Sequence, residues 1–288
     1  AIALAAVMAA SALTGCGSKK DKSTITPTPT DPSVEQPTTV DTSKETSSDT
    51  KDDSNSDKSF GLTKKTADGT ILQCFSWSFN TIKDSLEDIA LAGYSTIQTS
   101  PVNACYNGGD SGIDLNGSGK WYYHYQPTDW TIGNYQLGTK EEFKSMCEEA
   151  DKYGIKVIVD VVPNHTTKST EALGEGLLNA VGGIDNLYHK KGKDEVSNYK
   201  DRGECTHQAV GGLFDVNTEN IAFQNYFINY MNECIACGAD GFRFDTAKHI
   251  GLPDDPVEDS SMPNTFWTNV LSKLDNKDNL FIYGEVLQ

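Results

Sequence analysis

The feature that most constrains the fold is an alternation of short apolar runs with amphipathic helical patterns along residues 69–288. The clearest run, IKVIVDVV at residues 155–162, is almost continuous and rich in β-branched residues, which is typical of a strand buried on both faces of a parallel sheet. Further strands are predicted at 71–75, 94–99, 241–245 and 280–285. Apolar residues at helical spacing predict helices at about 82–93, 139–154, 221–238 and 266–274. Five strands separated by helices indicate a parallel α/β fold.

Polar and acidic side chains gather where these strands end. Asp160 lies near the end of the third strand, with Asn164 and His165 just beyond it, while Asp245 and Glu285 end the fourth and fifth. This is the edge at which (β/α)8 barrels keep their active sites, and no glycine-rich phosphate loop opens any helix. We therefore expect a (β/α)8 TIM barrel of which this chain carries strands 1 to 5, with three further units beyond residue 288. The segment after the third strand, about 163–212, is too long for a plain connection and predicts a small inserted subdomain, whereas 101–138 is expected to be a long loop.

The first sixty residues have a different character. Residues 1–16 are almost wholly apolar and indicate the end of a signal peptide, without its initiator Met or basic start. Their final Leu-Thr-Gly-Cys resembles a bacterial lipoprotein box, in which Cys16 carries the lipid; an ordinary signal peptide with an incidental Cys is the alternative. Residues 17–60 are rich in Ser, Thr, Pro and Asp and predict a disordered tether. Residues 61–288 would then be the catalytic part of a protein exported to the cell surface or the medium.

Charge and cysteine content exclude some classes of function. A net charge of −17 with no basic stripe argues against nucleic-acid binding and suits an extracellular protein that acts on a neutral polymer. Cys234 and Cys237 form a Cys-x-x-Cys, but no second pair or His stands at metal spacing. Buried thiols are therefore favoured there over a zinc or redox site.

Two carboxylates at strand ends suggest acid–base chemistry. In Gly241-Phe242-Arg243-Phe244-Asp245, side chains alternate, so Arg243 and Asp245 share a face. Arg243 is expected to hold the pKa of Asp245 down and keep it ionised, although a structural ion pair is the alternative. Glu285 follows the next strand and is a candidate general acid. Two such groups on neighbouring strands match the pair that retaining glycosidases use.

Four segments, in order along the chain, carry a family resemblance. They are DVVPNH at 160–165, GLFDVN at 212–217, GFRFDTAKH at 241–249 and YGEV at 283–286. A further segment, WYYHYQP at 121–127, is followed by IGN at 132–134 and LGT at 137–139. Together they resemble the motifs of the α-amylase family of glycoside hydrolases, and the resemblance covers residues 69–288.

The resemblance implies roles for particular residues. Asp245 would be the nucleophile and Glu285 the general acid/base. The residues expected to bind sugar are Tyr122, Tyr125, Gln126, His165, Arg243, Lys248 and His249. Tyr125 would stack on the ring at the cleavage site, since an aromatic face suits its apolar C–H face. A structural calcium ion would be held by Asn164, Asp215, the carbonyl of His249 and that of Thr206, a set of oxygen ligands that suits Ca²⁺.

Retaining, endo-acting hydrolysis of α-1,4-glucosidic bonds in starch-like glucans is the leading expectation, by a monomer. The family's third carboxylate would lie beyond residue 288, so residues 1–288 alone are expected to be inactive. A related transglycosylase or α-1,6-glucan hydrolase remains an alternative. A non-catalytic surface glucan-binding lipoprotein is disfavoured, because Asp245 and Glu285 are both present.

Overall fold

A computed structural model describes residues 60–108 and 120–287. The predicted signal peptide, Cys16 and the predicted tether up to residue 59 lie outside these residues. The central feature is a five-stranded parallel sheet in the order β1-β2-β5-β8-β9. Its strands are β1 (Ile71–Cys74), β2 (Thr96–Thr99), β5 (Lys156–Val161), β8 (Gly241–Phe244) and β9 (Phe281–Gly284). The parallel α/β architecture predicted from the sequence is confirmed.

Four helices connect or follow these strands close to their predicted places. They are α1 (Phe79–Leu91), α2 (Lys140–Tyr153), α6 (Ile221–Ala236) and α7 (Phe266–Ser272). The start of α2 is fixed by a capping box in which Thr139 and Glu142 each bond the other's backbone N–H. Its end is fixed by Gly154, whose φ of 72° is a left-handed conformation that favours glycine.

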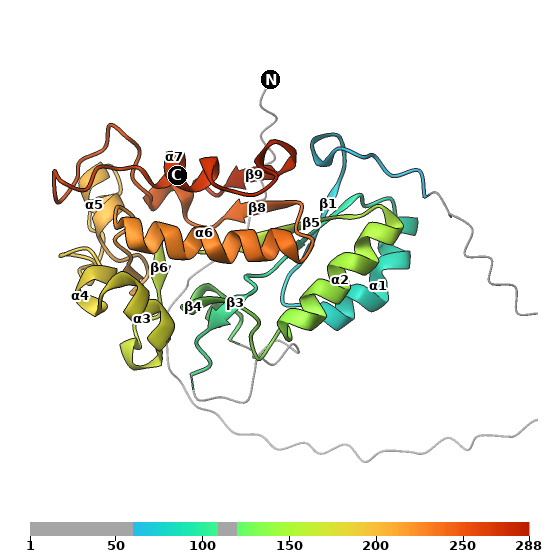
Figure 1. The fold of residues 1–288 in the computed structure, drawn as a ribbon, viewed down its shortest axis with the longest axis horizontal. Coiled ribbons are helices and arrows are strands. Elements are labelled where there is room, and N and C mark those ends of the chain that lie inside the picture. Colours follow the sequence, from blue (N-terminus) through green and yellow to red (C-terminus); the bar gives the residue numbers. More distant parts are fainter. Residues whose placement is uncertain (1–59, 109–119, 288) are drawn as a thin grey trace, which may run out of the picture. The chain divides into compact units, whose positions relative to one another are not determined.

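The helices pack on the sheet and on each other through apolar faces. Figure 1 shows α1 and α2 side by side, where the rings of Phe79 and Phe143 lie 5.2 Å apart. On α6, Phe227 contacts both Phe244 of β8 and Phe266 of α7, and all three rings are buried. The alternation along β8 is thus as predicted: its phenylalanines enter the core, which leaves Arg243 for the other side.

The segment between β2 and α2 is more ordered than the expected long loop. It holds β3 (Asn103–Cys105), a 3-10 helix η2 (Trp121–Tyr125) and β4 (Pro127–Ile132), and β3 pairs antiparallel with β4. The side-chain amide of Asn134 donates to the carbonyls of Pro101 and Asn103. Such contacts join residues about thirty positions apart, which is why local patterning did not reveal this ladder.

The predicted insertion between β5 and α6 is built from short elements, drawn at the left of Figure 1. They are β6 (His165–Thr166), η3 (Thr170–Ala172), α3 (Glu175–Val181), α4 (Ile184–Leu187), α5 (Arg202–His207) and β7 (Phe214–Asp215). β6 and β7 pair antiparallel, with His165 opposite Asp215. The remaining 3-10 turns are η1 (Thr66–Asp68), η4 (Ala247–His249) and η5 (Lys277–Asn279).

The cysteines within residues 60–108 and 120–287 are free, and Cys234 and Cys237 are both buried, in agreement with the prediction of buried thiols. Among the helices of these residues, none combines the length and apolar character needed to cross a bilayer.

Candidate functional site

Strand register brings the predicted catalytic groups to one edge of the sheet. Asp160 of β5 lies opposite Arg243 of β8, so their side chains share a face. Asp245 and Glu285 immediately follow β8 and β9. Their backbone N–H groups continue the ladders, Asp245 to the Val161 carbonyl at 2.9 Å and Glu285 to the Phe244 carbonyl at 2.8 Å. The carboxyl ends of three neighbouring strands therefore present acidic side chains together.

Arg243 joins three carboxylates. Its Nη1 donates to both oxygens of Asp160, at 2.9 and 2.8 Å, and to Oδ1 of Asp245 at 2.9 Å. Its Nη2 lies 2.9 Å from Oε1 of Glu285. One guanidinium thus fixes the positions of both predicted catalytic groups.

Tyr125 and His165 extend this network. The Tyr125 hydroxyl donates to Oδ2 of Asp160 at 3.0 Å, and His165 Nε2 donates to the Tyr125 carbonyl at 3.0 Å. Burial lowers the pKa of His165 to about 4, so its ring is neutral near neutral pH. His165 therefore holds Tyr125 in place.

The prediction that Arg243 holds the pKa of Asp245 below its usual value is wrong as a net direction. Burial raises the pKa of Asp245, and this exceeds the opposing effect of the Arg243 guanidinium. Burial likewise raises the pKa of Asp160 to about 8 against the same opposing guanidinium. The sequence identified the correct charge partner but could not show that Asp245 is only 6 % exposed.

A pocket of about 410 Å³ opens beside Glu285. Its lining residues are Tyr199, Val210, Thr246, Lys248, His249, Glu285 and Leu287. Lys248 lies 5.4 Å above the Tyr199 ring, and His249 Nδ1 donates to the Cys205 carbonyl at 2.8 Å. Two predicted sugar-binding residues therefore share a hollow with the predicted general acid.

Two other predicted sugar-binding residues make different contacts in this structure. Tyr122 is 43 % exposed and packs edge-on against Trp121 and Tyr123. Gln126 accepts a bond from the Thr167 hydroxyl at 3.4 Å. Tyr122 lies on η2 with Tyr125, and Gln126 directly follows η2. No bond of these two side chains reaches the carboxylates among the contacts described.

Sequence reasoning missed two residues as members of the site. Asp160 was noted at a strand end without a role, although an acid inside a buried β-branched run is itself a signal of a required charge partner. Tyr199 lies in the insertion, and its ring is 5.9 Å from that of His249. No local pattern distinguishes it from the other tyrosines.

The four predicted calcium ligands form two neighbouring pairs, Asn164 with Asp215 and Thr206 with His249. Asn164 and Asp215 are adjacent because the Val216 N–H donates to the Asn164 carbonyl at 2.8 Å. The bond from His249 to Cys205 sets η4 against α5, which carries Thr206. Asp215 is 1 % exposed, and its Oδ1 has no hydrogen-bond partner among the described residues. A buried carboxylate oxygen without a donor fits a cation ligand, so these oxygens are a suitable set for Ca²⁺.

Comparisons with known proteins agree with this geometry. The family model described as "Alpha amylase, catalytic domain" matches residues 79–288. A protein named "Alpha-amylase" from Butyrivibrio fibrisolvens is 52% identical over 246 residues, covering 81% of this chain and 25% of that protein. One from Clostridium acetobutylicum is 40% identical over 236 residues, covering 81% of this chain and 30% of its own length. The chain thus spans less than a third of the length of either relative.

Solved structures show the same fold. The α-amylase from Geobacillus thermoleovorans, solved in complex with acarbose, superposes with a TM-score of 0.59 at 21% identity. The match covers 78% of this chain and 48% of that structure. At such identity the likeness speaks for the fold, here the α-amylase barrel represented by five of its strands and an insertion. The family model matches residues 79–288, and the fold agrees with it. The chain therefore belongs to the α-amylase family of glycoside hydrolases.

Proposed function

We propose that the complete protein hydrolyses α-1,4-glucosidic bonds within starch-like glucans and retains the anomeric configuration. The observation that carries this proposal is the attachment of Asp245 and Glu285, from neighbouring strand ends, to the single guanidinium of Arg243. Retaining glycosidases need two carboxyl groups close together, and two carboxylates that each lie 2.9 Å from a nitrogen of one guanidinium suit that need.

The reaction would proceed by double displacement. An Asp245 oxygen attacks the anomeric carbon and forms a glycosyl ester, while the proton of Glu285 passes to the departing glycosidic oxygen. Glu285 then removes a proton from water, whose oxygen attacks the anomeric carbon and releases Asp245. Arg243 holds the nucleophile in place and favours its charged form, which burial alone would disfavour.

The neighbouring side chains would position the glucan. Tyr125 is held from both ends, by Asp160 and by His165, and a fixed aromatic ring suits stacking on a glucose face. Lys248 and His249, in the pocket beside Glu285, would hydrogen-bond the hydroxyls of the adjoining sugar.

Calcium would act on structure rather than on chemistry. Asn164, Asp215 and the carbonyls of Thr206 and His249 would hold it and tie β6–β7, α5 and η4 together. Since His249 reaches the sugar pocket, such an ion would keep that side of the pocket in place.

Export and anchoring are part of the same proposal. The apolar first sixteen residues, the Leu-Thr-Gly-Cys ending at Cys16 and the polar stretch after it support a protein attached to the outer face of a membrane. A polymeric substrate cannot enter a cell, so a catalytic domain on a surface tether suits it.

The experiment compares Asp245→Asn and Glu285→Gln in the full-length protein with Asp240→Asn. Asp240 precedes the same strand, β8, and accepts from the Val157 N–H at 2.9 Å, at the end away from the site. Loss of either catalytic group should lower starch hydrolysis by about 10³-fold or more with glucan binding retained. The Asp240 variant should stay active, and the first product should be the α-anomer.

A β-anomeric product would show an inverting enzyme. Full starch hydrolysis by the Asp245→Asn variant would show that another group is the nucleophile and would refute the assignment of Asp245.

A further inference from the structure

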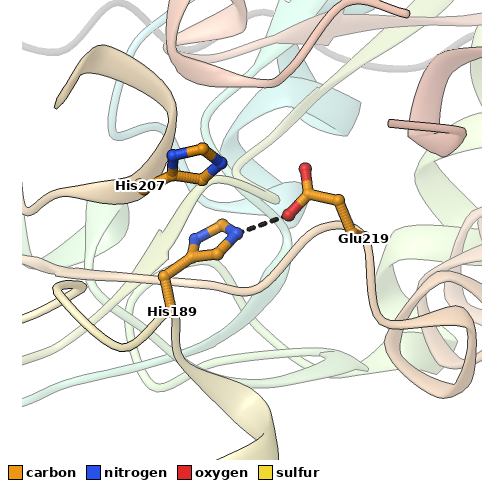
Figure 2. A group of neighbouring side chains, drawn as sticks. All are labelled: His189, His207 and Glu219. Atoms are coloured by element: carbon orange, nitrogen blue, oxygen red, sulfur yellow. Dashed lines mark hydrogen bonds and ion pairs between the residues drawn. The ribbon is translucent and has the colours of Figure 1, made fainter. Parts of the chain in front are cut away.

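A second cluster of ligating side chains lies in the insertion, away from Arg243 and its carboxylates. Figure 2 shows His189, His207 and Glu219 turned toward one another from three separate segments. His189 follows α4, His207 ends α5 and Glu219 precedes α6. All three are buried, with 5 to 7 % of each exposed, and the possible ligand atoms lie within 4.8 Å of one another.

The hydrogen bonds of the two imidazoles leave the same nitrogen on each ring facing the cluster. His189 Nδ1 lies 2.5 Å from Oδ2 of Asp215, and His189 Nε2 contacts Glu219. His207 bonds the Gly203 carbonyl, which is one turn back in α5, and so uses Nδ1. Its Nε2 is buried without a hydrogen-bond partner among the described residues and points toward Glu219 in Figure 2.

We propose that His189, His207 and Glu219 form a binding site for a zinc-type transition-metal ion. Two imidazole Nε2 atoms and one carboxylate are a ligand set that favours such ions over calcium. With metal–ligand bonds of about 2.0–2.1 Å, tetrahedral ligand atoms lie roughly 3.3 Å apart. Small side-chain shifts would therefore seat an ion, with His189 and Glu219 moving slightly apart and His207 moving closer. A fourth position remains for water.

The surroundings support a cation rather than an empty polar core. Asp215 holds the Nδ1–H of His189 and the Gly203 carbonyl holds that of His207, an arrangement that fixes the orientation of metal-binding imidazoles. A pocket of about 360 Å³ includes His189 and Glu219 in its lining and so gives an ion a route from solvent. The same lining contains Asp185, Glu258 and Asp259, whose charge would attract a cation.

The competing description needs no metal. In it His189 is an imidazolium held between Asp215 and Glu219, which pairs its charge with both carboxylates. It leaves His207 Nε2 buried and unpaired at the same place, an unfavourable arrangement that a metal ion would remove. The free nitrogen of His207 is therefore what distinguishes the two descriptions.

The test measures metal content, so it does not depend on hydrolytic activity. Full-length protein is stripped with a chelating resin, saturated with calcium and titrated with Zn²⁺ against a chromophoric zinc indicator. We expect one zinc ion per chain, not displaced by excess calcium, and visible absorption bands of a nitrogen-and-oxygen site when Co²⁺ replaces zinc. No zinc uptake by the wild type, or complete displacement by calcium, would overturn the proposal without needing any variant.

Variants then locate the ion. His207→Asn keeps a donor for the Gly203 carbonyl but lacks the Nε2 ligand, and Glu219→Gln removes the carboxylate charge. Each should weaken zinc binding by more than about 10-fold, the lower end of the loss seen even when an outer hydrogen-bond partner is removed. Glu258→Gln is the matched control, because Glu258 lines the same pocket but accepts from the Lys190 N–H at 2.8 Å. Equal zinc affinity in all three variants would place the ion elsewhere and refute the assignment.

Discussion

Replacing Asp160 by Asn tests whether the buried carboxylate network positions the catalytic groups. Asp160 is fully buried and accepts two bonds from Arg243 Nη1 and one from the Tyr125 hydroxyl. Because Arg243 donates to both of its oxygens, the geometry favours the ionised form, even though burial raises the pKa of Asp160 to about 8. In Asp160→Asn, one carboxylate oxygen becomes an NH₂ group, which cannot accept a hydrogen bond from Arg243 or from the Tyr125 hydroxyl.

The expected magnitude follows from breaking a buried ion pair. Removing one partner of such a pair costs about 3–5 kcal/mol of unfolding free energy. For a domain of this size that loss lowers Tm by roughly 6–20 °C. A guanidinium released from Asp160 no longer holds Asp245 and Glu285 in their present places, and misplacement by about 1 Å can cost about 10²-fold in rate. We expect kcat to fall more than KM rises, since the fault lies at the reacting groups.

The assay pairs calorimetry with initial rates on a soluble maltooligosaccharide, in the full-length protein with calcium present. Asp129→Asn is the control: Asp129 also accepts from a tyrosine hydroxyl, that of Tyr226 at 2.7 Å, but between α6 and β4. It should change stability without the loss in kcat. A Tm for Asp160→Asn within about 2 °C of wild type, with unchanged kcat, would show that residue 160 is held as a neutral acid and that the reasoning from charge is wrong.

Three further predictions concern metal, acid and location. Calcium removal should lower the Tm of the full-length protein, and Asp215→Ala should abolish that response, as scanning calorimetry with and without chelator would show. His124 is buried, with neither ring nitrogen bonded among the described residues, and burial lowers its pKa from 6.5 to about 4. Its contribution to stability is complete above pH 6.5 and is lost as pH falls toward 4, because the unfolded chain takes up the proton first. Between pH 6.5 and 4 the wild type should therefore lose about 3 kcal/mol more unfolding free energy than His124→Gln does. Denaturant titration of both proteins at each pH measures this difference. Finally, a fatty-acid probe should label the protein in its host through Cys16, and Cys16→Ser should remain unlabelled.

Each of these has a result that contradicts it. Identical melts with and without chelator would remove the calcium site. An acid sensitivity unchanged in the His124 variant would mean that this ring is not the group that binds the proton. Absence of label on the wild type would exclude the lipid anchor.

Local sequence patterns determined most of the secondary structure. The β-branched run at 155–162 and the helical spacing over 139–154 act over a few residues, so they could be read directly and agree with β5 and α2. Side-chain alternation likewise predicted that Arg243 lies on the opposite face of the strand from Phe242 and Phe244, and the structure buries both phenylalanines. The placement of acidic residues at strand ends indicated the edge at which the site forms.

Tertiary structure alone decided the charge partners of those acidic residues and how deeply they are buried. The register that sets Asp160 opposite Arg243 joins positions 83 apart in the chain, and the burial that raises the pKa of Asp245 comes from the surrounding elements. The β3–β4 ladder and the cluster of His189, His207 and Glu219 also depend on distant segments meeting. The physical reason is one of range: propensities and alternation act between near neighbours in sequence, whereas register, desolvation and ligand convergence are properties of packed elements.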